Sequence, residues 1–320
     1  MNFRTTFKTK PLNEKIKHQD AILLLGSCFS EHIGTKIQEA KFDTMSNPFG
    51  VLFNPISIFN LLDSEIGNDF FEKNYLQHQG IWYNYHLHSK ISNPDKEILK
   101  KEVSQKYQAT QTHLAKSKHI ILTFGTAFVY QLEGENEVIA NCHKMPSNLF
   151  KKDLLSVQKI TSYFDKIHSQ LTDNQQVILT VSPVRHIKES LILNSVSKSL
   201  LRIAAHELSQ KYPNVHYFPS YELLLDDLRD YRFFEADMLH PNKQAIEYIW
   251  QHFQGFAFDE STQGFIKDWN KILQALKHRP FYPASEAHQK FLKTTLEKVQ
   301  DFKNIDTSKE IDLLRTAIID

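Results

Sequence analysis

A glycine, a serine and a cysteine follow one another directly after an apolar run near the start of the chain. The run covers residues 21–25, and Gly26, Ser27 and Cys28 come next. Apolar residues recurring every four positions over residues 29–37 then predict a helix. A thiol at a helix N-terminus meets unpaired N–H groups and the positive end of the dipole, which lower its pKa. The pattern indicates a cysteine nucleophile, unless Ser27 only caps the helix and Cys28 only fills space.

A carboxylate and a histidine three residues apart form the second chemical feature. Asp237 and His240 occur in the run Asp-Met-Leu-His-Pro, just before a helical pattern. A carboxylate at this spacing can bond one ring nitrogen, fix the tautomer and stabilise the imidazolium. The alternative is a surface aspartate that caps a helix beside an ordinary histidine, because this short motif is common by chance.

The segments that must position these residues alternate between short apolar runs and longer helical patterns. Strands are predicted over 21–25, 82–89, 119–125, 177–183 and 215–220. Helices are predicted around 97–115, 154–171, 196–208 and 241–253, and residues 46–55 favour a loop or a short strand. Near-continuous apolar strands separated by helices predict an α/β fold, a three-layer α/β/α sandwich with a mostly parallel sheet.

The strand ends predict where the chemistry is placed. Ligands of such sheets bind at the carboxyl ends of the strands. Gly26, Gly125 and Ser182 all follow predicted strands, so we expect their loops to converge. We expect an α/β domain over 1–257 and a helical C-terminal extension over 258–320, because only helical patterns follow about residue 258.

Composition excludes several function classes. The net charge of +1 argues against a protein that binds nucleic acid by neutralising phosphates. No apolar stretch is long enough for a membrane span, and the polar N-terminus lacks a signal-peptide core, which predicts a cytoplasmic protein. No motif indicates a cofactor, and His86 and His88, two residues apart, are too isolated to predict a metal site.

The motifs together resemble the GSCFA family, a branch of the SGNH/GDSL hydrolase superfamily. Besides Gly-Ser-Cys-Phe-Ser and Asp-x-x-His-Pro, the runs NPFGVLFNP, TFGTAFVY, NCHKMP, SPVRH and RFFEADMLHPN carry the resemblance, which covers roughly residues 20–255. It implies that Cys28 stands where the superfamily has its nucleophilic serine, with Ser27 as the alternative nucleophile. It also implies that Asp237 and His240 complete the triad.

The resemblance further implies an oxyanion hole. Gly50 matches the glycine whose N–H helps hold the oxyanion. The superfamily's Gly-x-Asn falls on Gly125, Thr126 and Ala127, so its asparagine is absent. Asn54, Asn141 and the Thr126 hydroxyl are candidates for the missing donor.

Two basic side chains lie in motifs of the resemblance. His143, in NCHKMP, either contacts substrate or has a structural role. Arg185, at the end of a predicted strand, either binds an anionic substrate group or forms a structural salt bridge or cap.

These features predict an SGNH-type hydrolase of ester bonds, or an acyltransferase, whose partner is a small-molecule or acylated substrate. Two other interpretations stay open. The changed nucleophile and the missing asparagine favour a non-catalytic binding module on the same fold. Cys28 and Cys142 could also act as a redox-sensing thiol pair, which a reducing compartment disfavours. The sequence specifies neither the substrate nor the oligomeric state.

Overall fold

A five-stranded parallel sheet forms the centre of the computed structural model, which describes residues 4–67, 69–135 and 137–319. The strand order is β10-β9-β5-β1-β2, and every neighbouring pair is parallel. The strands are β1 (Ala21–Gly26), β2 (Thr44–Ser46), β5 (Ser117–Phe124), β9 (Gln176–Val181) and β10 (Val215–Tyr217). The predicted fold class is confirmed, and β1, β5 and β9 are adjacent, so their carboxyl ends lie at one edge.

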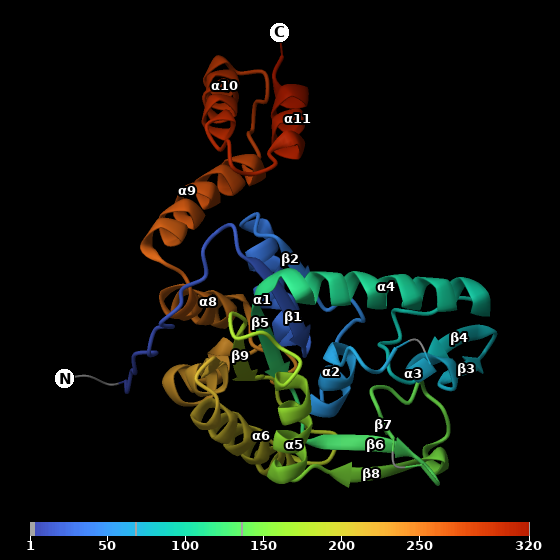
Figure 1. Ribbon diagram of the computed structural model, residues 1–320. Coiled ribbons are helices and arrows are strands. Elements are labelled where there is room, and N and C mark those ends of the chain that lie inside the picture. The colour runs from blue at the N-terminus through green and yellow to red at the C-terminus, as the bar shows by residue number, and fades with distance from the viewer. Residues whose placement is uncertain (1–3, 68, 136, 320) are drawn as a thin grey trace.

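Helices cover both faces of this sheet and complete three layers (Figure 1). Side chains alternate along β1, so that Leu23 and Leu25 pack on one face and Ile22 and Leu24 on the other. The first face is covered by α2 (Pro55–Leu62), α4 (Lys96–Lys116), α5 (Val157–His168) and α6 (Leu191–Lys211). The second face is covered by α1 (Cys28–Glu39), α8 (Lys243–Ala257) and the π-helix η2 (Leu223–Leu228). The remaining short helices of the body are α3 (Asp69–Glu72), α7 (Ser220–Glu222), η1 (Ser147–Leu149) and η3 (Tyr231–Phe233).

Two small antiparallel sheets lie beside the central one. They consist of β3 (Tyr75–His78) with β4 (Ile81–Asn84), and of β7 (Val138–Ile139), β6 (Phe128–Leu132) and β8 (Phe150–Leu154). The strand predicted over residues 82–89 ends at Asn84, because the Asn84 side chain accepts from the His86 N–H and turns the chain. Strands β2, β3, β6, β7 and β8 were not predicted, because each is only two to five residues long.

Two helical predictions need correction at their edges. Leu154 belongs to β8, because Ser156 caps α5 by accepting from the Lys159 N–H. On α6, Val196 and Ile203 belong to the apolar pattern that predicts the helix, but they are 41% and 48% exposed. The buried face of α6 instead includes Lys198.

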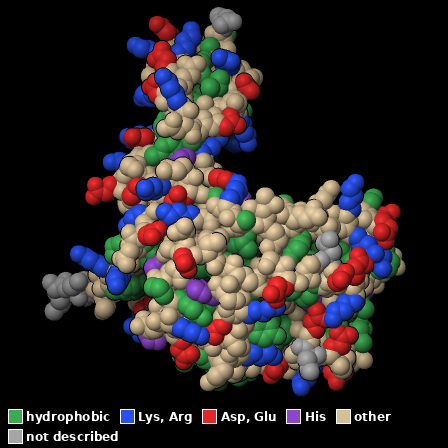
Figure 2. Space-filling view, in the orientation of Figure 1, with side chains coloured by type: hydrophobic (Ala, Val, Ile, Leu, Met, Phe, Trp, Pro, Cys, Tyr) green, Lys and Arg blue, Asp and Glu red, His purple; other side chains and the backbone are tan. Residues whose placement is uncertain are grey.

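The predicted helical extension is present as α9 (Glu260–Lys277), α10 (Glu286–Gln300) and α11 (Ser308–Ala317). These helices project from the body as an arm (Figure 1). The Trp269 indole donates to the Glu39 carbonyl at the end of α1 over 2.7 Å, and Lys41 pairs with Glu310 over 2.9 Å. The arm is therefore anchored where α1 ends. Charges of both signs are interspersed over the visible face of body and arm (Figure 2), as the net charge of +1 leads one to expect.

The end of β1 depends on a glycine. Gly26 has a φ of 143°, and a Cβ at this position would lie 2.3 Å from the Thr123 carbonyl oxygen of β5. The Gly26 N–H donates to the Asn47 side chain and its carbonyl accepts from the Leu52 N–H. Any side chain at Gly26 would push β1 and β5 apart where α1 begins.

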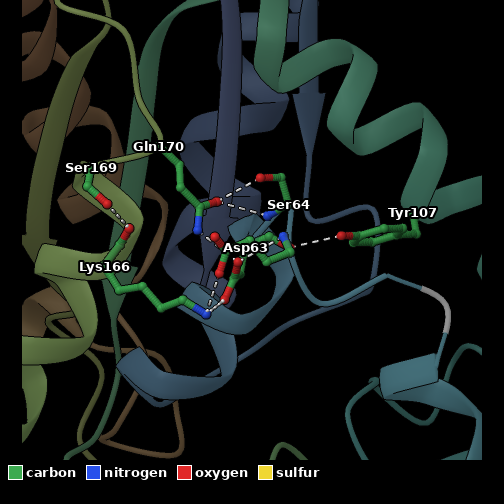
Figure 3. A network of polar contacts seen from close by, with 7 residues as sticks. Asp63, Ser64, Tyr107, Lys166, Ser169 and Gln170 are labelled. Carbon is green, nitrogen blue, oxygen red and sulfur yellow. Dashed lines mark hydrogen bonds and ion pairs between the residues drawn. The ribbon is translucent and has the colours of Figure 1, made fainter.

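A buried carboxylate joins three helices on the first face (Figure 3). Asp63, at the end of α2, accepts from Lys166 at 2.7 Å and from Gln170 at 2.9 Å, and its carbonyl accepts from the Tyr107 hydroxyl. Burial raises the pKa of Asp63, but the hydrogen bonds from Lys166, Gln170 and the Glu65 N–H outweigh it and lower the pKa. The ionised carboxylate thus stabilises the contact of α2 with α5, and the Asp63 carbonyl links the end of α2 to α4.

Replacing Gly26 by alanine is expected to lower the free energy of unfolding by more than about 2 kcal/mol, because the backbone must shift to admit the methyl group. Urea denaturation followed by circular dichroism measures this. Gly255→Ala is the matched control: it lies within α8 with no atom close to the added Cβ, so alanine should stabilise by up to about 1 kcal/mol. Equal effects of the two substitutions would contradict the close approach at Gly26.

Asp63→Asn is expected to cost about 1–2 kcal/mol near neutral pH, because it removes a charge-assisted hydrogen bond. The Asp63 pKa is lower in the folded state, so its contribution is complete above the unfolded value of about 3.9. It is lost as the pH falls through the folded pKa, where parent and variant should converge. Asp268→Asn, which breaks an exposed pair with Lys271, should change stability by less than about 0.5 kcal/mol. A pH-independent difference for Asp63→Asn would exclude the ionic contribution.

Candidate functional site

The Gly-Ser-Cys motif joins β1 to α1. The Ser27 N–H donates to the Thr123 carbonyl over 3.1 Å, which continues the pairing of β1 with β5. The Ser27 hydroxyl accepts from the Phe29 N–H and caps α1, and Ser27 is fully buried. Cys28 is the first residue of α1 and is partly exposed. Of the two predicted nucleophiles, only Cys28 is accessible.

Opposing influences act on the Cys28 thiol. Burial raises its pKa most strongly, and the negative charge of Glu31 raises it further. The positive charge of Lys198 and the N–H groups of Phe29 and Cys28 act in the opposite direction. The net pKa is raised, so the expectation of a lowered pKa at the helix N-terminus was wrong for the free protein. Desolvation outweighs the N–H groups because it acts on the charged form alone.

Asp237 holds His240 in one orientation. One carboxylate oxygen accepts from the N–H groups of Leu239 and His240 at 2.8 and 3.0 Å, and the other lies 2.6 Å from His240 Nδ1. The backbone N–H groups of His240 and Leu239, and then the ring, lower the Asp237 pKa to about 2. An ionised carboxylate at Nδ1 requires the proton there, which leaves Nε2 to accept a proton.

The loop that carries this pair is fixed by backbone contacts and by Arg185. The Glu235 N–H donates to the His240 carbonyl at 2.7 Å, and Phe234 forms an isolated β-bridge with Pro241. Arg185 donates to the Met238 carbonyl at 3.2 Å, and its guanidinium lies 4.2 Å from the centre of the Phe234 ring. Of the two roles open for Arg185, the contacts describe the structural one.

The charge of His240 lowers the pKa of a histidine on α1 and of a histidine in the loop after β9. Burial lowers the pKa of His32, one turn after Cys28, and the charge of His240 lowers it further. Burial also lowers the pKa of His186 to about 3, with Lys198 and His240 adding to the effect. No hydrogen bond joins Cys28 directly to His240 within the described residues, and such contacts often tighten only when substrate binds.

Lys198 is a residue that the sequence analysis missed. It is 2% exposed, and its ammonium donates to the carbonyls of Gly125 at 2.6 Å and Ser182 at 2.8 Å. Burial lowers its pKa to about 7, whereas Cys28 raises it. The signal was present, because Lys198 stands three residues before Leu201 on the apolar face of α6.

Most predicted oxyanion donors are already engaged. The Gly50 N–H donates to the Asn47 carbonyl at 2.8 Å, and the N–H groups of Gly125 and Thr126 both donate to the Phe53 carbonyl. The Asn54 side chain caps α2 by bonding both the N–H and the hydroxyl of Ser57.

The last side-chain candidates have local partners as well. The Thr126 hydroxyl bonds the hydroxyl of Ser197 and the N–H of Phe128. The Asn141 side chain accepts from the His143 N–H and donates to the Ser89 hydroxyl.

His143 is buried and contacts neighbouring residues through both ring nitrogens. Its two ring nitrogens lie 2.8 Å from the Asn84 carbonyl and 3.2 Å from the Ser89 hydroxyl, and the ring stacks on Tyr83. Burial lowers its pKa to about 4.

Two of the buried nitrogens that have no hydrogen-bond partner among the described residues lie beside Gly125 and Gly26. They are Nε2 of His186, which lies against Gly125, and Nδ2 of Asn47, whose side-chain oxygen accepts from the Gly26 N–H.

Further observations concern metal sites, membrane spans, His86 and the two cysteines. No group of side chains that could hold a metal ion occurs among the described residues, and no helix described there is long and apolar enough to span a membrane. His86 is buried and lies 3.1 Å from Glu137. Both cysteines, Cys28 and Cys142, are free thiols.

Comparison with known families matches two segments of the chain. The model of the GSCFA family matches residues 21–253, and that of the "GSCFA domain protein, C-terminal domain" matches residues 269–320. A comparison with curated proteins finds no significant match. The first match spans the sheet with β1, α1 and the Asp237–His240 loop, and the second covers most of the arm. The chain therefore belongs to the GSCFA family.

Proposed function

We propose that this protein is an SGNH-type thiol enzyme that hydrolyses an ester-linked acyl group or transfers it to an alcohol. The observation that carries the proposal is the Asp237–His240 pair, held with Nε2 free, together with an accessible cysteine at the first turn of α1. The influence of His240 on His32, one turn along α1, supports their proximity.

In the proposed reaction, Nε2 of His240 accepts the Cys28 proton and the sulfur attacks the ester carbonyl. Asp237 stabilises the imidazolium that forms. The negative charge moves to the carbonyl oxygen, which the N–H of Cys28 at the start of α1 can hold. Gly50 can contribute only if its N–H leaves the Asn47 carbonyl. His240 then protonates the departing alcohol, and water or a second alcohol releases the acyl group.

A second candidate is a non-catalytic binding module at the same edge of the sheet. The raised pKa of Cys28 and the engaged donors at Gly50 and Asn54 favour it. This candidate requires an unreactive thiol, whereas the enzyme requires acylation of Cys28.

An activated ester such as p-nitrophenyl acetate is expected to acylate Cys28 and to turn over. Peptide mass spectrometry should find the acetyl group on the peptide that contains Cys28 and Ser27, and Cys28→Ala should abolish both the adduct and ester hydrolysis. Cys142→Ala is the control and should behave as the parent. Full activity of Cys28→Ala would refute the mechanism, and an adduct on Ser27 would reassign the nucleophile.

Asp237→Asn is expected to slow acylation by about 10²- to 10⁴-fold, because the amide no longer stabilises the His240 imidazolium. The Asp237 pKa of about 2 keeps the carboxylate ionised, so the loss should be constant from about pH 4 upward. Pre-steady-state release of p-nitrophenol measures it. Asp230→Asn, which removes an exposed carboxylate that caps η3, is the control. Parent-like acylation by Asp237→Asn would remove Asp237 from the proposed triad.

A further inference from the structure

A lysine without a carboxylate partner is buried at the carboxyl edge of the sheet. Lys198 is 2% exposed, and the groups that it contacts are the neutral carbonyls of Gly125 and Ser182. No ion pair of Lys198 with an acid is present among the described residues. Burying an unpaired ammonium is costly, so this position needs a reason beyond packing.

The strand pairing places this ammonium beside the start of α1. Gly26 of β1 pairs with Thr123 of β5, and the Ser27 N–H continues the pairing by donating to the Thr123 carbonyl. Gly125, whose carbonyl lies 2.6 Å from the Lys198 nitrogen, follows Thr123 by two residues. Adjacent strands are about 4.8 Å apart. The ammonium therefore lies at the carboxyl ends of β5 and β9, and β5 is the strand that pairs with the end of β1 just before Cys28.

Two charged side chains, from different helices, shift the pKa of the Cys28 thiol. Burial raises the Cys28 pKa, Glu31 of α1 raises it further, and Lys198 of α6 lowers it. The influence is mutual, because Cys28 raises the pKa of Lys198 against the effect of burial. His186 and His240 lie in the loops after β9 and before α8, and the charges of Lys198 and His240 both lower the pKa of His186.

We propose that Lys198 is a positioning residue of the Cys28 nucleophile, a buried ammonium that stabilises the thiolate and then the charge developing on the substrate. This inference rests on the proposed function. Lys198 transfers no proton in this step: the S–H bond of Cys28 breaks, His240 takes that proton, and the sulfur electron pair forms the bond to the carbonyl carbon. The negative charge faces the ammonium at each stage.

The first test follows alkylation of Cys28 by iodoacetamide against pH, in a Cys142→Ala background. Lys198→Met should raise the apparent pKa of Cys28 by about one to two units, which slows alkylation about ten- to hundredfold at neutral pH. Glu31→Gln should shift it in the opposite direction. Lys267→Met, an exposed lysine of the arm, is the control and should have no effect. An unchanged Cys28 titration in folded Lys198→Met would overturn the inference.

A second measurement does not require Lys198→Met to fold. In protein labelled with ¹³C at the lysine ε-carbon, one signal should titrate near pH 7, as burial of Lys198 implies. In Cys28→Ala this signal should titrate at lower pH, because the variant has no thiolate to raise the pKa of Lys198. A signal that Cys28→Ala leaves unchanged would overturn the inference.

The acylation experiment with p-nitrophenyl acetate separates this inference from the proposed function. If Cys28 is acylated but its pKa does not depend on Lys198, the proposed enzymatic function stands and the role of Lys198 is refuted. Coupling without acylation would support the role of Lys198 in stabilising the thiolate and refute the enzyme.

Discussion

The close approach of β1 to β5 at Gly26 is the constraint on which the site depends. The Thr123 carbonyl occupies the space of a side chain at Gly26 and also accepts the next N–H of the chain, that of Ser27. This contact fixes where β1 ends and where α1 begins. It therefore decides that Cys28, and not Ser27, is the accessible residue at the helix start. It also places the start of α1 beside the end of β5, where the Gly125 carbonyl binds the ammonium of Lys198.

The three central strands β1, β5 and β9 could be predicted from the sequence because they are buried on both faces and appear as apolar runs. The ends of the strands and the small antiparallel sheets were harder to predict. Asn84 ends β4 through a side-chain hydrogen bond, and nothing in the alternation of the following residues reports it. β6 and β8 form a sheet by pairing with each other, and such pairing is specified by partner strands rather than by local pattern.

For the site, residue types were predictable and their partners were not. The spacing of Asp237 and His240 predicts their bond, since a short loop leaves the two side chains within reach. The predicted direction of the Cys28 pKa shift was wrong because the shift depends on burial and on Glu31, and burial is a property of the fold. Lys198 was missed because a lysine in a helix is usually solvated, and only the complete sheet shows that its nitrogen is enclosed.

The anchoring of the arm at the end of α1 has a practical consequence for protein production. Trp269 is fully buried and occupies the Glu39 carbonyl, and Lys41 and Glu310 bring the base of α11 to the same place. Expression of the α/β body alone would leave that helix end and its apolar surroundings exposed to water. A shortened version for crystallisation should therefore keep α9 to α11, because the other end of the same helix carries Cys28.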